Sequence, residues 1–396
     1  MMERSLRIAH VSPTFPPYHG GTGNVCYHQA QVLARRGHDV HVFTANYPGT
    51  PADPPGVTVH RLAAPIHAGN APLMPSLLWR LRGFDVIHLH YPFLFGGELA
   101  AFSSWHSAVP LVMNYHSDLI PVGWKGPIFS AYERVVSPRL FRYARRVIVV
   151  TAAHGRTARA APILAHRGEA VIEIPNGVDL SVFRPLEQRD RDLAREKLGL
   201  HGERGKRPIL VFVGSLDAAH HYKGLRVLLR AFAAVRTRAL LVVVGDGNDR
   251  RRYEAITSEL GIADDVLFAG AKPPPELARI LGAADGLVMP SEVPESFGMV
   301  LIEAMACAIP VIASDSPGPR SIVDEGRDGF FVPPGDVQAL SRAIETWTEI
   351  GDAKRHAMGC AGRRKVEERY GWSRIGDQLE ALYTDVMAER SLCRAF

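Results

Sequence analysis

Short apolar runs alternate with amphipathic stretches along the whole chain. In the first part, seven runs rich in β-branched residues have the length of single strands: residues 6–13, 39–45, 57–64, 85–90, 110–116, 146–152 and 170–178. Most are followed by a helical pattern, such as residues 24–37. Because strands that alternate with helices form parallel sheets covered on both faces, the pattern predicts an α/β fold.

The same alternation begins again after a charged segment. Residues 179–208 are charged and loop-like in composition, which is typical of a domain boundary. Six further strand-like runs follow: residues 208–216, 239–247, 266–270, 286–291, 310–314 and 329–334. We therefore predict two doubly wound α/β domains with a cleft between them, formed by residues 1–178 and 179–372. The helical tail has a break at residues 370–373, and its last helix, 373–396, is expected to pack back on the first domain.

Composition narrows the class of protein. The chain has 396 residues, of which 46% are hydrophobic and 22% charged, so it can bury a large core. It has no run of about 18 apolar residues, and its start turns polar too soon for a secretory signal. These features predict a cytoplasmic protein. The four cysteines lack C-x-x-C spacing, which argues against a disulfide framework and a zinc site.

The net charge of +5 suits nucleotide phosphates, anionic membrane surfaces or nucleic acid. The basic residues are dispersed and no aromatic-interleaved basic patch occurs, which argues against nucleic acid. The basic stretch of residues 132–146 is compatible with peripheral contact at the inner face of a membrane. An ordinary solvated helix would have the same composition, so both interpretations stay open.

In an open parallel sheet, ligands bind beyond the carboxyl ends of the strands, so the loops there are informative. The first loop contains Gly20, Gly21 and Gly23 before a helix, which would let backbone N–H groups approach an anion. Its spacing resembles G-x-G-x-x-G, but Cys26 takes the third glycine's place and the second strand ends without an acid. This argues against a dinucleotide site. A simple flexible turn remains the alternative.

Histidines form a second candidate. His116 ends a strand, where an imidazole can orient a hydroxyl or hold a phosphate, although a structural histidine is the alternative. His88 and His90 share one face of a strand by the period of two. We find no suitably spaced third ligand, so no metal site is predicted.

A third candidate is Lys223, which lies between a strand that ends at Gly214 and a helix that begins after Gly224. An ammonium and helix N–H groups would converge there, which suits a phosphate. A solvated lysine is the alternative.

The stretch "PESFGMVLIEAMACAIPVIAS" carries two acids. Glu303 lies one turn into an otherwise apolar helix, and helical side chains lean toward the N-terminus, so its carboxylate is expected to point back to the loop that holds Glu295. Sugar hydroxyls are donors that satisfy carboxylates, and the amides of residues 297–299 would accept a phosphate. The alternative for Glu303 is an ion pair with an arginine inside the fold.

Together these motifs resemble the retaining GT-B glycosyltransferases of family 4. Glu295 and Glu303 match the E-x(7)-E signature of that family, and the resemblance covers nearly the whole chain. It includes "PPYHGGTGN", "IPNGVDLSVFRP", "VFVGSLDAAHHYKG", "VVVGDGN", "VLFAG" and "DGFFVPPGDVQAL". The resemblance implies the GT-B fold, and transfer of a sugar from a UDP- or GDP-sugar to a hydroxyl acceptor with retention of the anomeric configuration. It implies no metal and no cofactor beyond this co-substrate.

The resemblance also assigns roles to residues. Glu295 would hold the donor sugar's hydroxyls, Glu303 the ribose hydroxyls, and Lys223 the diphosphate. His116 would contact the donor sugar near the reacting carbon, so His116, Glu295 and Lys223 are the predicted catalytic residues. The predicted donor site comprises Gly21, Gly214, Ser215, Lys223, Gly245, Gly247, Ala271, Glu295, Phe297, Gly298, Met299 and Glu303.

One position departs from the family pattern. Ser215 stands where the family usually has an arginine that partners the lysine, and the loop before Lys223 is longer and contains His220 and His221. A histidine of that loop or an arginine elsewhere would have to supply the second positive charge. Otherwise stabilisation of the leaving group would rest more on helix dipoles.

The expected mechanism is front-face substitution. Lys223 and the helix N-termini would stabilise the departing diphosphate, which would take the acceptor's proton. No second carboxylate occupies the place of a retaining hydrolase's nucleophile. A nucleotide-sugar epimerase or hydrolase, or an inactive nucleotide-binding scaffold, remains the alternative. The sequence names neither the acceptor nor the oligomeric state.

Overall fold

The structure is a computed structural model that describes residues 5–18, 20–49, 53–67, 72–119, 126–235 and 239–395. The chain forms two compact units. The first domain comprises residues 1–176 and 372–396, and the second domain comprises residues 177–371. No helix in the described part of the chain combines the length and apolar character that crossing a bilayer requires.

The first domain contains a parallel sheet of seven strands in the order β3-β2-β1-β6-β7-β8-β9. The strands are β1 (Arg7–Val11), β2 (Asp39–Ala45), β3 (Val57–Leu62), β6 (Val86–Tyr91), β7 (Leu111–Tyr115), β8 (Arg146–Val149) and β9 (Val171–Glu173). A separate antiparallel hairpin joins β4 (Ile66–His67) and β5 (Pro72–Leu73). All seven sheet strands coincide with the runs that the sequence predicts.

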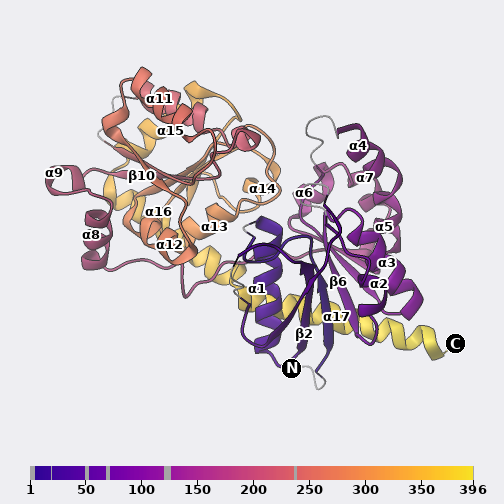
Figure 1. The fold of residues 1–396 in the computed structure, drawn as a ribbon. Coiled ribbons are helices and arrows are strands. Elements are labelled where there is room, and N and C mark those ends of the chain that lie inside the picture. The colour runs from indigo at the N-terminus through magenta and orange to yellow at the C-terminus, as the bar shows by residue number, and fades with distance from the viewer. Residues whose placement is uncertain are drawn as a thin grey trace. The chain divides into compact units, whose positions relative to one another are not determined.

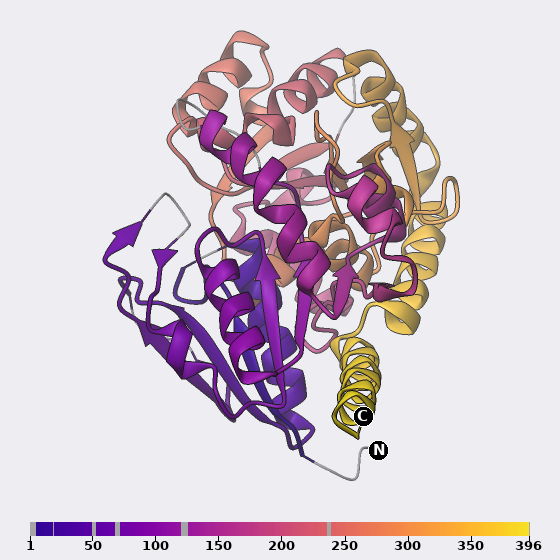
Figure 2. The same ribbon diagram turned by 90° about the vertical axis from the view of Figure 1, so that its right-hand side faces the viewer.

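Helices cover both faces of this sheet (Figure 1). The helices are α1 (Gly21–Arg35), α2 (Leu77–Arg80), α3 (Gly96–Ser107), α4 (Gly126–Val135), α5 (Ser137–Tyr143), α6 (Ala152–Thr157), α7 (Ala161–Ala165) and α17 (Trp372–Ala395). One core lies under α2, α3 and α5, and the opposite core lies under α1 and α17. Figure 2 shows the purple helix α3 in front of the strands. The C-terminal helix therefore belongs to the core of the first domain.

The second domain contains a parallel sheet of six strands in the order β12-β11-β10-β13-β14-β15. The strands are β10 (Ile209–Val213), β11 (Leu240–Val244), β12 (Val266–Gly270), β13 (Gly286–Met289), β14 (Val311–Ser314) and β15 (Gly329–Val332). Each again coincides with a predicted run, so two doubly wound sheets are confirmed.

Helices also cover both faces of the second sheet. They are α8 (Gln188–Lys197), α9 (Gly202–Gly205), α10 (Leu225–Ala234), α11 (Arg250–Glu259), α12 (Pro274–Ala283), α13 (Met299–Ala306), α14 (Pro317–Arg320), α15 (Val337–Glu349) and α16 (Gly351–Arg369). Helices α10, α11 and α15 pack over one face, and α12, α13 and α16 lie on the other (Figure 1). Two short 3-10 segments, η3 (Ala218–Lys223) and η4 (Ala263–Asp265), precede α10 and β12.

The charged segment after the first domain is not the loop that its composition predicts. It contains α8 and α9, and α8 buries only Ala194. Ionic contacts hold α8 in place, because Arg191 and Arg195 both pair with Asp285. A helix fixed by ion pairs lacks the apolar stripe by which sequence analysis recognises helices.

The two segments that connect the domains run side by side. The N–H of Val178 donates to the carbonyl of Tyr370 over 2.7 Å, and Val178 pairs with Gly371 in a short parallel bridge. Tyr370 and Gly371 form the break that the sequence predicts between α16 and α17.

Candidate functional site

The strand order of the second domain defines where a ligand would bind. From β10 the chain proceeds outward through β11 and β12, whereas β13 lies on the other side of β10 and leads to β14 and β15. This reversal between β10 and β13 is the topological switch point, where loops diverge and open a crevice. The candidate site is therefore built from the loops that follow these two strands.

Those two loops meet through a partly buried ion pair. Lys223, from the loop after β10, places its Nζ 2.7 Å from Oε1 of Glu295, from the loop after β13. The hydroxyl of Ser291, which is fully buried, donates to the same carboxylate oxygen over 2.7 Å. Two residues predicted separately from the sequence thus form one polar cluster. Ser291 completes it and was not predicted.

Close backbone packing fixes the relative position of the two loops. Gly224 has φ +77°, and a Cβ there would lie 1.9 Å from the carbonyl oxygen of Pro290. The N–H of Glu292 donates to the carbonyl of Tyr222 over 2.7 Å. Only glycine allows this approach. Lys223 is therefore held beside the Glu295 loop by its own neighbour.

The loop before α13 is anchored on its other side. Phe297 is buried and packs edge-on against Tyr370, with ring centroids 5.8 Å apart. The N–H of Gly318 donates to the carbonyl of Glu295 over 3.1 Å. Gly298, with φ +108°, caps α13, which begins at Met299. The first N–H groups of α13 thus lie directly after the Glu295 loop, as an anion-binding helix start requires.

Glu303 lies within α13, half-buried among apolar neighbours. Burial raises the pKa of its carboxyl group to about 8. Within the described residues its carboxylate has no ion pair, and the nearby Arg363 bonds instead to Glu367 and to two backbone carbonyls. The alternative of an internal salt bridge is therefore not supported. Among the residues that the structure describes, this carboxyl group has no side-chain partner.

Two glycines in the loop after β11 pack against the loop after β10. A Cβ on Gly245, which has φ +148°, would lie 1.8 Å from the carbonyl oxygen of Gly214. A Cβ on Gly247 would lie 2.3 Å from the amide nitrogen of Asp217. Ala271 follows the end of β12, whose Gly270 accepts a hydrogen bond from the N–H of Gly245. The predicted residues of the β10, β11 and β12 loops thus gather at one edge of the sheet.

Ser215 has a local structural role. Its hydroxyl donates to Oδ2 of Asp217 over 2.9 Å, and Oδ1 of Asp217 accepts from the N–H of Asn248. His221 is exposed, and its Nδ1 lies 3.0 Å from the carbonyl oxygen of Ala218. The described contacts place no arginine beside Ser215.

In the first domain, Gly21 is the first residue of α1. No described atom lies within 4 Å of the position that a Cβ on Gly21 would occupy, whereas a Cβ on Gly23 would lie 2.9 Å from the carbonyl oxygen of Thr14. Gly23 is thus required by packing and Gly21 is not. The open space at Gly21 is what an approaching ligand would need.

His116 follows the end of β7, as the sequence predicts. It is buried, and its Nε2 lies 3.0 Å from Nδ1 of His90 and 2.9 Å from the side-chain amide of Asn114. Burial lowers the pKa of His116 to about 3, so the ring is neutral. The sequence shows no suitably spaced third ligand for His88 and His90, but the parallel pairing of β1 and β6 brings His10 beside them.

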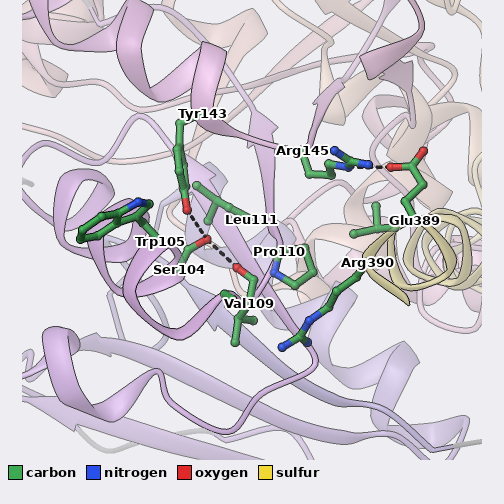
Figure 3. Close-up of a pocket in the computed structure, with 11 residues that line it drawn as sticks. Ser104, Trp105, Val109, Pro110, Leu111, Tyr143, Arg145, Glu389 and Arg390 are labelled. Carbon is green, nitrogen blue, oxygen red and sulfur yellow. Dashed lines mark hydrogen bonds and ion pairs between the residues drawn. The ribbon is translucent and has the colours of Figure 1, made fainter. Parts of the chain in front are cut away.

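A pocket of about 380 Å³ in the first domain lies elsewhere (Figure 3). It is lined by Trp105, Tyr143 and Leu111, among others, and the ion pair of Arg145 with Glu389 forms one side. Leu111 starts β7, whereas His116 follows the other end of this strand. The pocket is therefore separate from the strand-end residues that the sequence predicts.

Comparisons with known proteins bear on both domains. Residues 19–182 match the family model described as Glycosyltransferase Family 4, and residues 194–365 match the one described as Glycosyl transferases group 1. A GDP-mannose-dependent alpha-mannosyltransferase of Mycolicibacterium smegmatis is 32% identical over 98% of this chain and 99% of its own. A D-inositol 3-phosphate glycosyltransferase of Acidothermus cellulolyticus is 30% identical over 98% and 91%, respectively.

Solved structures are similar over nearly the whole chain. The sucrose-phosphate synthase of Thermosynechococcus elongatus has a TM-score of 0.80 and 27% identity, covering 97% of this chain and all of its own. The Anabaena protein HepE, in complex with UDP and glucose, has a TM-score of 0.76 at 22% identity, covering 96% of this chain and 99% of its own.

Proposed function

This chain belongs to glycosyltransferase family 4, and on that premise we propose that it transfers a sugar from a UDP- or GDP-sugar to a hydroxyl acceptor with retention of configuration. The predicted GT-B fold is confirmed. The relatives named above are transferases, which supports a glycosyltransferase and not an epimerase, a hydrolase or an inactive scaffold.

The observation that carries this proposal is the cluster at the switch point. A diphosphate needs a cation, and sugar hydroxyls need an acceptor; Lys223 and Glu295 supply one of each. In the absence of donor these two side chains satisfy each other. Donor binding exchanges their mutual contact for the diphosphate and the sugar hydroxyls, so neither charge is left unpaired at any stage.

The chemistry proposed for these residues is electrostatic. As the bond from the anomeric carbon to the diphosphate breaks, negative charge develops on the leaving oxygen. Lys223 and the N–H groups at the starts of α10 and α13 stabilise that charge. The departing diphosphate takes the proton of the acceptor hydroxyl, which attacks from the same side. Because Lys223 and these helix starts can stabilise the charge, we propose that the transfer needs no metal ion.

Donor and acceptor classes come from the relatives. One relative is named for GDP-mannose and another for D-inositol 3-phosphate, so GDP-mannose and phosphorylated inositols are the first pair to test. UDP and GDP are therefore both kept as candidate donor nucleotides.

The experiment is a thermal melt of the purified protein with UDP, GDP and ADP and their sugar conjugates, with and without magnesium. A ligand that binds the folded state at 100 times its Kd stabilises it by about 2.7 kcal/mol. We expect one nucleotide family to raise the Tm by several degrees without metal. Failure of all three families would overturn the proposal.

A matched pair of variants then tests Glu295. Glu295→Gln should lower turnover of the stabilising donor about 100-fold while leaving nucleoside diphosphate affinity within about twofold, because the partner of Glu295 is the sugar. Glu292→Gln, three residues earlier in the same loop, is the control and should change neither quantity. An equal loss of nucleoside diphosphate affinity in Glu295→Gln would refute this assignment.

Peripheral membrane contact stays a prediction. It is supported by aromatic side chains exposed on α3 and α5: Phe102 is 52% exposed, Trp105 65% and Tyr143 40%. Helix α5, which carries Tyr143, also has two exposed arginines, Arg139 and Arg142. Amphipathic aromatic rings beside arginines suit the interface of an anionic bilayer.

A further inference from the structure

Four histidines lie along one face of the first sheet. His10 on β1 pairs in register with His88 on β6, and His90, two residues further along β6, pairs with Asn114 on β7, which precedes His116. The four imidazoles are 0–8% exposed. Burying this many polar rings in a core is costly unless each makes hydrogen bonds.

Three of these rings form a continuous chain of hydrogen bonds. Nδ1 of His10 lies 3.0 Å from Nε2 of His90, and Nδ1 of His90 lies 3.0 Å from Nε2 of His116. The ring centroids of consecutive members are 5.3 Å apart, with interplanar angles of 30° and 9°. His88 stacks on the chain at His10 and His90 but bonds elsewhere, through Nδ1 to the hydroxyl of Tyr383.

Every member of the chain is neutral, because burial lowers the pKa of all three imidazoles, in His10 and His116 to about 3. A neutral imidazole has one donor and one acceptor nitrogen. Once the tautomer of one ring is chosen, each hydrogen bond fixes the tautomer of the next. The three rings thus share two consistent arrangements, one with a proton on every Nδ1 and one with a proton on every Nε2.

The far end of the chain favours one arrangement. Nε2 of His10 is buried and, within the described residues, has no hydrogen-bond partner. A buried N–H without an acceptor is rarer in proteins than an acceptor without a donor. The arrangement that leaves Nε2 of His10 unprotonated is therefore preferred. It makes His10 donate to His90, and His90 donate to His116, from Nδ1 in both cases.

We propose that His10 and His90 are positioning residues for His116, which they hold as the Nδ1-protonated tautomer with its ring plane fixed. This inference rests on the proposed function together with the role that the family resemblance implies for His116, which is contact with the donor sugar. His10 and His90 do not contact the donor; they act through the hydrogen-bond chain. A ring that is neutral, oriented and of one tautomer presents the same atoms to the donor in every molecule.

The first test reads the tautomer directly and needs no activity. Two-bond ¹⁵N–¹H NMR spectra of the ¹⁵N-histidine-labelled full chain should show His116 as a single Nδ1-protonated tautomer. His10→Leu removes the first donor, so we expect His116 to become a mixture of tautomers. His88→Leu is the matched control, because His88 is equally buried on the same face but lies outside the chain. It should leave the His116 signals unchanged.

A conservative variant distinguishes loss of the hydrogen bond from a general disturbance of the fold. His10→Asn keeps an amide near the place of the original Nδ1 and can donate to His90, so it should preserve the wild-type tautomer. With the donor found by the thermal melts, His10→Leu should lower turnover about tenfold with unchanged donor affinity, and His10→Asn should restore most of it.

The outcomes are distinguishable. If His116 keeps its tautomer in folded His10→Leu, the hydrogen-bond chain does not position it and the inference fails, whatever the activity. If the tautomer changes and turnover does not, the hydrogen-bond chain is supported and the role of His116 in transfer fails.

Adding one equivalent of zinc provides a further check, because His10, His88 and His90 form the one group of three possible metal ligands found among the described residues. Tight zinc binding that shifts all three signals together would assign the cluster to a metal and overturn the inference.

Discussion

The carboxyl ends of the two sheets present polar groups in opposite ways. In the first domain the polar side chains are neutral and bond to one another, as in the chain from His10 through His90 to His116. In the second domain they are charged, and Lys223 and Glu295 face each other across the switch point. Neutral rings that bond to one another in a core fix the positions of their side chains. The two members of an ion pair can instead separate and each bind a group of a ligand. This contrast supports our proposal that the second domain binds the charged donor.

Glycines differ in the same sense. In the second domain, other backbone atoms of the protein fill the space beside Gly224 and Gly245, since a Cβ on either would lie within 2 Å of a backbone oxygen. At Gly21 in the first domain no described atom lies within 4 Å of the added Cβ. The same residue type thus brings two loops together in one domain and leaves open space in the other. This contrast separates glycines that build a site from glycines that a ligand would approach.

The largest effect should come from removing the cation. Lys223→Met abolishes the ion pair and the proposed contact with the diphosphate, so turnover of the donor should fall about 100- to 1,000-fold. Nucleoside diphosphate affinity should fall with it, by about tenfold, which is where this variant differs from Glu295→Gln. Rates of nucleotide release and calorimetric titration measure the two quantities.

The control for Lys223 is Lys206→Met. Lys206 also pairs with a glutamate in the second domain, but its side chain is 74% exposed. A surface pair of this kind contributes little, so both rate and affinity should stay at wild-type values. If Lys223→Met behaved like this control, the ion pair at the switch point would have no part in donor binding.

The glycine contrast is tested by two alanine substitutions. Gly224→Ala forces a left-handed residue against Pro290, and should cost about 2–4 kcal/mol, lowering the Tm of the second domain by about 4–15 °C. Gly21→Ala has the space it needs at a helix start, so the Tm should stay the same or rise slightly.

Donor affinity tests the role of Gly21 separately from its effect on stability. If the diphosphate approaches the backbone at Gly21, as the resemblance implies, Gly21→Ala should weaken donor binding although it leaves stability intact. A Gly21→Ala protein with normal donor affinity would show that the open space at this position is not used by the donor.

Much of the fold was predictable because its elements are read from periodicity. Every strand of both sheets follows from an apolar run, and the break at Tyr370 follows from its neighbours. Helix α8 was missed because its stability comes from Asp285, almost a hundred residues away, and not from an apolar stripe. Long-range ion pairs leave no local pattern in the sequence.

The candidate site was predictable residue by residue but not as a set of contacts. The motifs identified Lys223 and Glu295 separately, whereas their pairing depends on β10 and β13 being neighbours. Likewise, His88 and His90 were seen on one face, but His10 joins them only through the register of β1 with β6. Pairing of strands far apart in the chain is what the sequence does not state.

The smallest effect expected concerns Glu303 in the second domain. Unlike Lys223 and Glu295, its carboxyl group has a pKa raised to about 8, so it is protonated at neutral pH. Because the folded state binds this proton more tightly than the unfolded state does, the stabilisation is complete below about pH 4.5 and is lost as pH rises through 8. Glu303→Gln removes this dependence. Relative to wild type, its Tm should therefore rise by a few degrees between pH 6 and pH 8.5.

Nucleotide binding connects Glu303 to the comparison of the two domains. Ribose hydroxyls would donate to the carboxylate, and hydrogen bonds to the charged form lower a carboxyl pKa. Binding of the preferred nucleoside diphosphate near pH 7 should therefore release up to one proton. Calorimetry in buffers of different ionisation enthalpy measures this release, which should vanish in Glu303→Gln together with part of the affinity. Proton release that persisted in the variant would mean that Glu303 does not meet the ribose, and that its carboxyl stays protonated within α13 when nucleotide binds.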